Sequence, residues 1–169
     1  LNETVEQVKE NLFTETSLPN VNVEVLDLPE VTGEPVLINE LLQNLISNGI
    51  KYNDSLSKSI TVGHQRKRIG EANSFVDAFF VADNGIGIPE KMRSDVFTIF
   101  RRLQSADAYG GGSGAGLTIS KKIVEKHGGK LWIDPSYDCG TCFWFTLKHV
   151  QGDPEDHFVH SQNRHELCT

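Results

Sequence analysis

Two asparagines one helical turn apart, in the middle of a long amphipathic pattern, constrain this chain more than any other feature. From Val36 to Tyr52 apolar residues recur at helical spacing, which predicts a helix with one core face. That face carries Ile38, Leu41, Leu42, Leu45, Ile46 and Gly49. Asn44 and Asn48 fall on an adjoining face together with Glu40 and Lys51.

Asparagine needs a reason to occupy the middle of a helix, because its side chain competes for backbone hydrogen bonds. One interpretation of this face is solvated polar surface. The other is that the amide oxygens of Asn44 and Asn48 are neutral ligands for Mg²⁺, an ion that takes few protein ligands and shares its remaining sites with water and phosphate. Spacing alone leaves both interpretations open.

An acidic, glycine-containing turn follows a strongly apolar strand. Residues 83–89 read Asp-Asn-Gly-Ile-Gly-Ile-Pro and come directly after the strand pattern Phe79 to Ala82. Turn chemistry alone explains such a composition. A functional interpretation is that the glycines let backbone approach a flat ligand while Asp83 accepts a hydrogen bond from an exocyclic amine. Adenine offers that amine, whereas guanine would oppose an acceptor oxygen to the carboxylate.

A glycine-rich stretch, Gly110 to Leu117, opens the last helical pattern. Such an entry exposes backbone N–H groups at a helix N-terminus, where an anion such as phosphate binds. The spacing of Gly111 and Gly116 is that of a P-loop, but Leu117 stands where the P-loop lysine is required. A flexible linker is the alternative interpretation.

Between the acidic turn and the glycines, residues 96–103 carry two aromatics followed by two arginines. Taken alone, this segment is typical of a small amphipathic helix. An arginine placed here suits a transferred γ-phosphoryl group, because its planar fork of donors matches the equatorial oxygens.

In this order the four segments resemble the catalytic and ATP-binding domain of bacterial sensor histidine kinases, in the GHKL ATPase superfamily. The matching segments are the N box at 44–52, the G1 box at 83–88, the F box at 97–102 and the G2 box at 112–117. The resemblance extends from Leu1 to about Leu147. The residues of the F box and of 121–129 are most similar to those of phytochrome-like members. Gly49 departs from the pattern, since alanine is usual there.

The resemblance implies a role for each matching residue. Asn44 and Asn48 would bind Mg²⁺, with Asn48 and Arg102 serving catalysis and Arg102 positioning the γ-phosphate. Lys51 would contact phosphate, Tyr52 would pack on the adenine, and Asp83 would accept from its amine. The other nucleotide-binding residues would be Gly85, Gly87, Ile88, Gly112, Gly114, Gly116 and Leu117. The loop from about Arg93 to Gly114 would be a mobile ATP lid.

The order of strand and helix patterns predicts an α+β fold, with a mixed sheet covered by helices. The resemblance refines this to a two-layer α/β sandwich of the Bergerat type, with helices on one face of the sheet. The predicted helices are 1–16, 35–52 and 115–127, and the predicted strands are 21–26, 59–63, 75–82, 130–133 and 141–147. A polar loop between the predicted strands 59–63 and 75–82 is expected to carry the basic triplet 66–68. Residues 1–18 are assigned to a linker helix, 19–148 to the ATP-binding domain and 149–169 to a loosely ordered tail.

Charge and composition exclude several classes of partner. A net charge of −7 with a single short basic cluster argues against a nucleic-acid surface. No apolar run reaches the roughly 18 residues of a membrane span, and three cysteines without a secretory signal favour a reducing, cytoplasmic setting. Cys139 and Cys142 form a C-x-x-C pattern that we interpret as structural, because it precedes a strand and no second pair follows.

The resemblance also predicts partners. The chain would supply Mg²⁺ and ATP to a histidine on a separate helical hairpin of the same, homodimeric kinase, upstream of a response regulator. One rival is a clamp ATPase of the gyrase or mismatch-repair kind, which hydrolyses ATP with a glutamate one turn before the Mg²⁺ asparagine, where this chain has Asn44. The other rival is a module that binds nucleotide and partners without turnover.

Overall fold

A five-stranded mixed sheet with the strand order β1-β2-β3-β5-β4 organises the chain. The computed structural model describes residues 1–15, 20–69, 74–98 and 114–147. The strands are β1 (Val21–Val25), β2 (Lys58–Ile69), β3 (Ser74–Asp83), β4 (Leu131–Ile133) and β5 (Thr141–Phe145). β1 pairs in parallel with β2, and the other three pairings are antiparallel.

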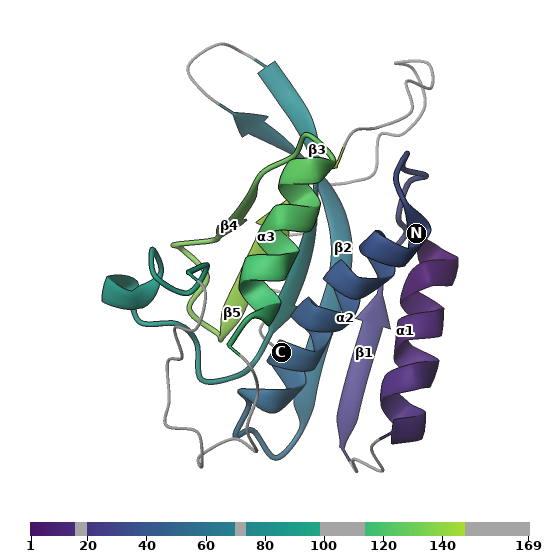
Figure 1. The fold of residues 1–169 in the computed structure, drawn as a ribbon. Coiled ribbons are helices and arrows are strands. Elements are labelled where there is room, and N and C mark those ends of the chain that lie inside the picture. Colours follow the sequence, from purple (N-terminus) through teal and green to yellow (C-terminus); the bar gives the residue numbers. More distant parts are fainter. Residues whose placement is uncertain (16–19, 70–73, 99–113, 148–169) are drawn as a thin grey trace.

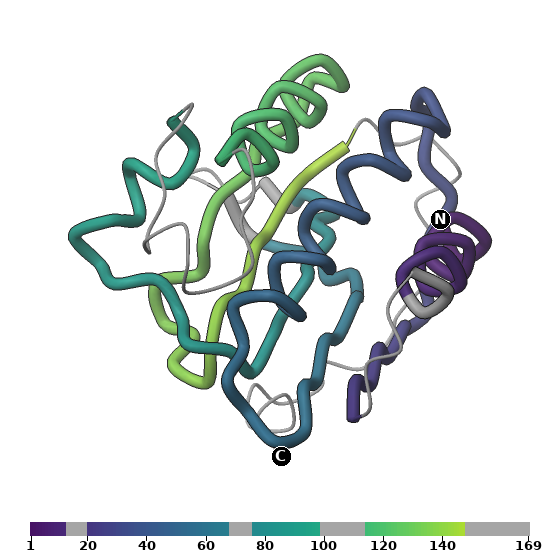
Figure 2. Tube along the Cα trace, turned by 60° about the horizontal axis from the view of Figure 1, so that its bottom comes forward, coloured from purple at the N-terminus to yellow at the C-terminus, as the bar shows by residue number. Residues whose placement is uncertain are grey.

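Three α-helices lie side by side over one face of this sheet (Figures 1 and 2). They are α1 (Asn2–Glu15), α2 (Pro35–Lys51) and α3 (Gly116–Lys126), and a short 3-10 turn, η1, spans Glu90–Met92. The mixed sheet with one helical layer confirms the predicted α+β, two-layer class. α2 occupies the middle of the helical layer and contacts both α1 and α3.

The side chains of the central strands alternate between two apolar layers, as strand geometry requires. On β3, Phe79 and Val81 face the helices, whereas Phe80 belongs to a second cluster on the opposite face of the sheet. Trp144 of β5 joins that second cluster and lies 4.9 Å from Phe80, ring centroid to ring centroid. Both faces of these strands are therefore buried, which explains why their sequences read as continuous apolar runs.

The basic triplet 66–68 lies within strand β2, so its predicted placement on a loop is wrong. β2 and β3 continue as a two-stranded hairpin beyond the sheet, with Arg66 opposite Asp77 and Lys67 opposite Val76. The Lys67 ammonium lies 3.7 Å from the Trp144 ring centroid and 3.8 Å from Asp134. These cross-strand and tertiary contacts stabilise a strand whose own residues show no apolar alternation.

Helix α3 ends as its sequence indicates, at the pair Gly128-Gly129. Gly128 adopts a positive φ of 68° and donates its N–H to Glu125, and Gly129 donates to Val124. The left-handed residue lets these two backbone donors turn back onto the last carbonyls of the helix. α3 therefore ends at Lys126 with His127 as its C-cap, one residue from the predicted end.

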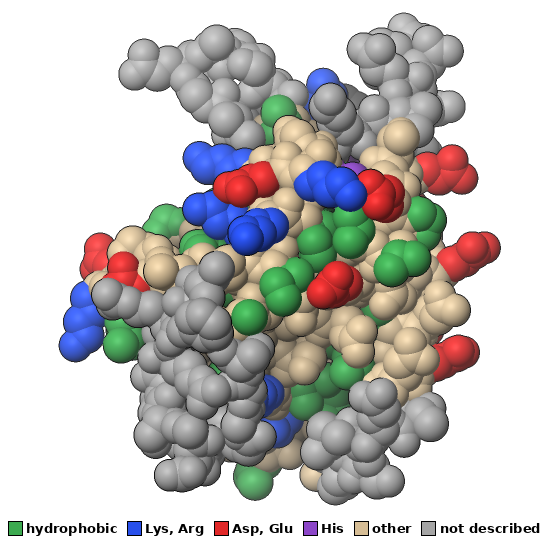
Figure 3. Space-filling view, in the orientation of Figure 1, with side chains coloured by type: hydrophobic (Ala, Val, Ile, Leu, Met, Phe, Trp, Pro, Cys, Tyr) green, Lys and Arg blue, Asp and Glu red, His purple; other side chains and the backbone are tan. Residues whose placement is uncertain are grey.

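The remaining surface is mixed. Lys and Arg side chains gather over α3 in the space-filling view (Figure 3), which agrees with the exposed Lys121, Lys122 and Lys126 of that helix. In the described ranges, no helix combines the length and the apolar character needed to cross a membrane. α1 places Val5 and Val8, both fully buried, in the same core cluster as α2. The predicted tail at 149–169 lies outside the described residues.

Candidate functional site

Asp83, the last residue of β3, is a buried carboxylate whose two oxygens have different surroundings. Asp83 is only 6% exposed to solvent. Oδ1 accepts the backbone N–H of Gly85 at 2.9 Å and that of Thr141 at 3.0 Å. Within the described ranges no hydrogen bond reaches Oδ2. One oxygen therefore holds the turn, and the other is available to a ligand.

Burial raises the pKa of Asp83 to about 6, although the two backbone N–H groups favour the ionised form and oppose this shift. A proton would reside on Oδ2, because Oδ1 already accepts two N–H donors. Ionised Asp83 thus presents an acceptor at Oδ2 and protonated Asp83 presents a donor there. The preferred hydrogen-bond partner at this position changes with pH.

The C-terminal half of α2 lies directly against Asp83. A Cβ atom on Gly49 would lie 3.0 Å from Asp83 Cβ and 3.4 Å from Oδ2, so the missing side chain allows this close approach. The neighbouring Asn48 is half-buried on the same stretch of helix. The helix that carries the predicted asparagine face thus meets the predicted acidic turn at Gly49, the residue after Asn48.

The end of α2 is bonded to the glycine turn. The carbonyl of Tyr52, the C-cap of α2, accepts the N–H of Ile86 at 3.1 Å. A Cβ on Gly85 would collide with that same carbonyl, so only glycine fits here. Lys51 Nζ lies 5.4 Å from the Tyr52 ring centroid, which places the two predicted ligand-contacting side chains next to each other.

Two further glycines let the turn pack against the start of β5. Gly87 has φ +70° and would bring a Cβ to 3.1 Å from the carbonyl of Gly140. Gly140 has φ +154°, and a Cβ there would collide with the carbonyl of Asp83. Gly140 and Thr141 are not among the site residues that the sequence predicts. The register between β3 and β5, which pairs Asp83 with Thr141, brings them there.

The N-terminus of α3 closes the other side of the asparagine face. A Cβ on Gly116 would lie 3.3 Å from Asn44 Oδ1, so α2 and α3 approach closely at this point. Asn44 Nδ2 is buried without a hydrogen-bond partner in the part of the chain that the structure describes. Leaving such a donor unpaired costs about 1–3 kcal/mol. Gly114, just before α3, has φ +66°, and Leu117 packs against the core.

Asn84 has a structural role that the sequence did not predict. Its Oδ1 accepts from Asn53 Nδ2 and from the backbone of Ser59, both at 2.8 Å, and its Nδ2 donates to the carbonyl of Ser57 at 2.9 Å. This network fixes the loop between α2 and β2 to the acidic turn. Asn84 therefore supports the site, with both its side-chain oxygen and its side-chain nitrogen hydrogen-bonded.

The beginning of the predicted lid is held on the body of the domain. Arg93 Nε donates to the carbonyl of Ile88 at 3.1 Å, and Nη1 donates to that of Pro135 at 3.2 Å. Val96 is buried, and the Phe97 carbonyl accepts from Thr118 Oγ1 at 3.0 Å. Residues 93–98 of the predicted lid thus contact the body of the domain, and the mobility of the lid stays a prediction. Residues 99–113, with Arg102 and Gly112, lie outside the described residues.

These described residues combine an open carboxylate oxygen, an unpaired buried amide and a glycine-rich helix N-terminus. Residues 33–151 match the family described as histidine kinase-, DNA gyrase B- and HSP90-like ATPases. The chain belongs to this ATPase family. The matched range contains every site residue described above.

Proteins with sequences similar to this chain include phytochromes and sensory kinases. Cyanobacterial phytochrome B of Nostoc sp. is 44% identical over 151 residues, which cover 89% of this chain and 19% of that protein. The adaptive-response sensory kinase SasA of Rippkaea orientalis is 34% identical over 80% of this chain and 33% of its own length. The chain thus spans about a fifth to a third of these two relatives.

Solved structures of histidine kinase domains share the fold of this ATPase-family member. The mycobacterial sensor histidine kinase MprB aligns with a TM-score of 0.69 and 26% identity, over 88% of this chain and 95% of that one. The full-length ShkA kinase in complex with AMPPNP aligns with a TM-score of 0.68 over 89% of this chain. At 19% identity the second comparison concerns the fold alone.

Proposed function

We propose that this chain binds ATP with Mg²⁺ and donates the γ-phosphoryl group to a histidine on a separate helical hairpin, as the catalytic half of a sensor histidine kinase. The observation that carries the proposal is the open Oδ2 of Asp83, which is buried beside Gly49 and suits an exocyclic amine. An acceptor at this place selects adenine over guanine.

The residues around this carboxylate fit the rest of a nucleotide. Tyr52 would pack on the base, and Lys51 would contact phosphate. Asn44 and Asn48 would hold Mg²⁺, which supplies charge neutralisation at the phosphates. The buried Nδ2 of Asn44, which lacks a partner in the described part of the chain, supports a phosphate here, because a phosphate oxygen would accept its N–H and leave Oδ1 for the ion. Backbone N–H groups at the N-terminus of α3 suit phosphate oxygens.

The remaining assignments follow the family motifs. Gly85, Gly87 and Ile88 would shape the base pocket. Gly112, Gly114, Gly116 and Leu117 would form the phosphate side, and residues 93–114 would contain the lid. Arg102 would contact the γ-phosphate and stabilise its charge during transfer.

The reaction proposed is a direct transfer. A ring nitrogen of the acceptor histidine attacks the γ-phosphorus, and the bond from that phosphorus to the bridging oxygen breaks. ADP leaves with the electron pair, and the imidazole loses its proton to the surroundings. The protein contributes positioning and charge stabilisation. The acceptor hairpin belongs to the same homodimeric kinase and precedes residues 1–18, the kinase is cytoplasmic, and a response regulator receives the phosphoryl group next.

A clamp ATPase remains the alternative enzyme, because the matched family includes gyrase-like members. Clamp enzymes need a carboxylate base one turn before the Mg²⁺ asparagine, where this chain has the amide of Asn44. An amide cannot take a proton from an attacking water, so this alternative predicts a hydrolysis that the chain lacks the base to perform. A binding module without turnover is the other alternative, and it predicts nucleotide binding without transfer.

A phosphotransfer assay in trans distinguishes these functions. The chain is incubated with γ-labelled ATP, with and without a matching phosphoacceptor hairpin. We expect acid-labile label on the hairpin histidine only, and Arg102→Ala should slow the transfer more than it weakens ATP binding. Label on a histidine of the isolated chain, with His165 the first to check, would contradict the proposal. Rapid phosphate release without a hairpin would favour the clamp ATPase.

A further inference from the structure

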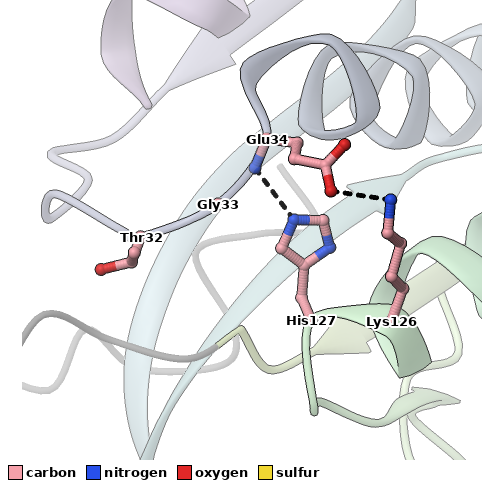
Figure 4. Close-up of a pocket in the computed structure, with 5 residues that line it drawn as sticks. All are labelled: Thr32, Gly33, Glu34, Lys126 and His127. Atoms are coloured by element: carbon pink, nitrogen blue, oxygen red, sulfur yellow. Dashed lines mark hydrogen bonds and ion pairs between the residues drawn. The ribbon is translucent and has the colours of Figure 1, made fainter.

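His127, at the C-terminal end of α3, forms hydrogen bonds through both ring nitrogens, and Figure 4 shows the one to Glu34. Its Nδ1 lies 2.8 Å from the carbonyl of Ile123, in the last turn of α3. Its Nε2 lies 3.1 Å from the backbone nitrogen of Glu34, the N-cap residue of α2. The residue is 9% exposed, so both bonds are sheltered from water.

These partners determine the tautomer. A carbonyl oxygen only accepts, so Nδ1 must carry the proton and donate to Ile123. A backbone N–H only donates, so Nε2 must be unprotonated and accept from Glu34. The geometry therefore requires the uncharged Nδ1–H form, in which one ring satisfies the end of α3 and the beginning of α2 together.

Among the described residues, no other side chain forms hydrogen bonds to both the end of α3 and the beginning of α2. The N-cap of α2 has no side-chain capping bond of its own. Glu34 and Lys126 form an ion pair of 2.7 Å beside the ring, but both side chains are more than half exposed, so water screens it. A Cβ on Gly33 would lie 2.9 Å from the imidazole, which shows how closely the backbone before α2 packs on the ring.

A cavity of about 290 Å³ lies at this joint and is lined by Thr32, Gly33, Glu34, Lys126 and His127. It is a poor ligand site, because the imidazole nitrogens and the ion pair are already engaged with one another and with backbone. The arrangement is better suited to joining the helices than to binding a molecule.

The joint lies at the opposite end of α3 from the nucleotide site. α2 and α3 run antiparallel, since His127 meets Glu34 at one end and Gly116 meets Asn44 at the other. The eleven steps from Gly116 to His127 correspond to about 16 Å of helix. The joint therefore holds the C-terminal end of α3 against the N-terminal end of α2, while Gly116 and Asn44 meet at the other end.

We propose that His127 is a positioning residue for the nucleotide site. Its uncharged imidazole sets the distance between α2 and the N-terminus of α3, and so the spacing of Asn44 from the backbone N–H groups that would meet phosphate. This inference rests on the proposed ATP binding. It means that ATP affinity also depends on His127, a residue remote from the nucleotide.

Three variants test it by ATP calorimetry. His127→Phe keeps a ring but removes both nitrogens, whereas His127→Gln retains one donor group and one acceptor in its amide. Lys126→Gln is the matched control, because it breaks the neighbouring ion pair and leaves the imidazole bonds intact. We expect His127→Phe to weaken ATP binding about tenfold, as loss of a buried partner does. The other two variants should stay within about twofold of the parent chain.

The outcomes separate this inference from the proposed function. If the parent chain binds no ATP, both fail. If it binds ATP and His127→Phe binds equally well, or His127→Gln is as weak as His127→Phe, only the positioning role is overturned. Nitrogen-15 NMR of the parent chain provides a test that needs no folded variant. An Nδ1–H imidazole supports the joint, and an Nε2–H or doubly protonated ring at neutral pH overturns it.

Discussion

Asp83 Oδ1 accepts the backbone N–H of Thr141 at 3.0 Å, across 58 positions of sequence. This bond joins the end of β3 to the beginning of β5 and, with the N–H of Gly85, occupies one oxygen of the carboxylate. The direction of the other oxygen follows from it. Base selection in the proposed function depends on this arrangement, because a carboxylate free to rotate would not hold its acceptor in one place.

Replacing Asp83 by Asn should weaken ATP binding by about tenfold or more. The new amide must turn its oxygen toward the N–H groups of Gly85 and Thr141, which places its NH₂ at the position of Oδ2. That group donates, and it would oppose the donor amine of adenine. Calorimetry measures the change, with Asp77→Asn on the distant hairpin as control. Equal affinities for the Asp83 variant and the parent chain would contradict the role of Asp83.

ATP affinity should fall as the pH drops through about 6, the raised pKa of Asp83. Protonation at Oδ2 converts the acceptor into a donor, so the adenine amine loses its partner. Guanine nucleotides should lose less, because their carbonyl oxygen can accept from the protonated carboxyl. Calorimetry with ATP and GTP over this pH range tests both statements, and an ATP-to-GTP affinity ratio that does not change with pH would refute them.

The Asp83 carboxyl should also make the stability of the fold depend on pH, with the opposite sign to its effect on ATP affinity. Its pKa in the folded chain, about 6, is above its ordinary value of 3.8, so the folded chain binds the proton more tightly than the unfolded chain. The stability contributed is complete below pH 3.8 and is lost as the pH rises through 6. Between about pH 4.5 and 7.5 the free energy of unfolding should fall by about 2 kcal/mol relative to Asp83→Asn. Urea unfolding of both proteins measures it, and parallel pH profiles would be inconsistent with a raised pKa.

Removal of the Asn48 amide should reduce the dependence of ATP binding on Mg²⁺. The ion bridges phosphates and a small number of protein oxygens, so loss of one ligand weakens the ternary complex more than the binding of nucleotide alone. Asn48→Ala is compared with Gln43→Ala on the same helix, at several Mg²⁺ concentrations. Asn44→Ala should have the smaller effect of the two asparagine variants. An unchanged metal dependence in Asn48→Ala would show that the ligand assignment is wrong.

Hydrogen exchange should divide the proposed lid into two parts. Residues 93–98 are held by the bonds of Arg93 and Thr118, so their exchange should be slow with or without nucleotide. Exchange at 99–114 should slow when ATP and Mg²⁺ bind, since the phosphates supply contacts that the glycines lack. Thr118→Val, which removes one donor without changing shape, should speed exchange near Phe97 only. Equal rates at 99–114 in both states would argue against a lid.

Several features of the site were predictable because they depend on local chemistry. The spacing of Asn44 and Asn48 needs only the period of a helix, and the position of Asp83 needs only an apolar strand followed by turn residues. The glycine-rich start and the Gly-Gly end of α3 are likewise local signals. These features predicted the helix and the acidic turn before any contact was known, and the family resemblance assigned them to a predicted nucleotide site.

Other features depended on contacts between distant segments. The basic triplet gave no periodic signal, yet β2 continues through it because β3 pairs with it and Trp144 lies under Lys67. The family pattern includes a glycine at Gly140, but the reason for it follows only from its approach to the Asp83 carbonyl. The anchoring of residues 93–98 likewise depends on carbonyls supplied by Ile88, Pro135 and Phe97.

Sequence by itself determined which residues have the chemistry to bind a nucleotide, because residue type and local period decide what a helix face or a turn can offer. Tertiary structure decided which of their atoms are available. Both oxygens of Asp83 are equivalent in the sequence, and only the register of β3 with β5 commits Oδ1 to Thr141. His127 reads as an ordinary helix end until the antiparallel packing of α2 and α3 brings Glu34 to its second nitrogen, since a hydrogen bond exists only where folding places donor and acceptor within reach.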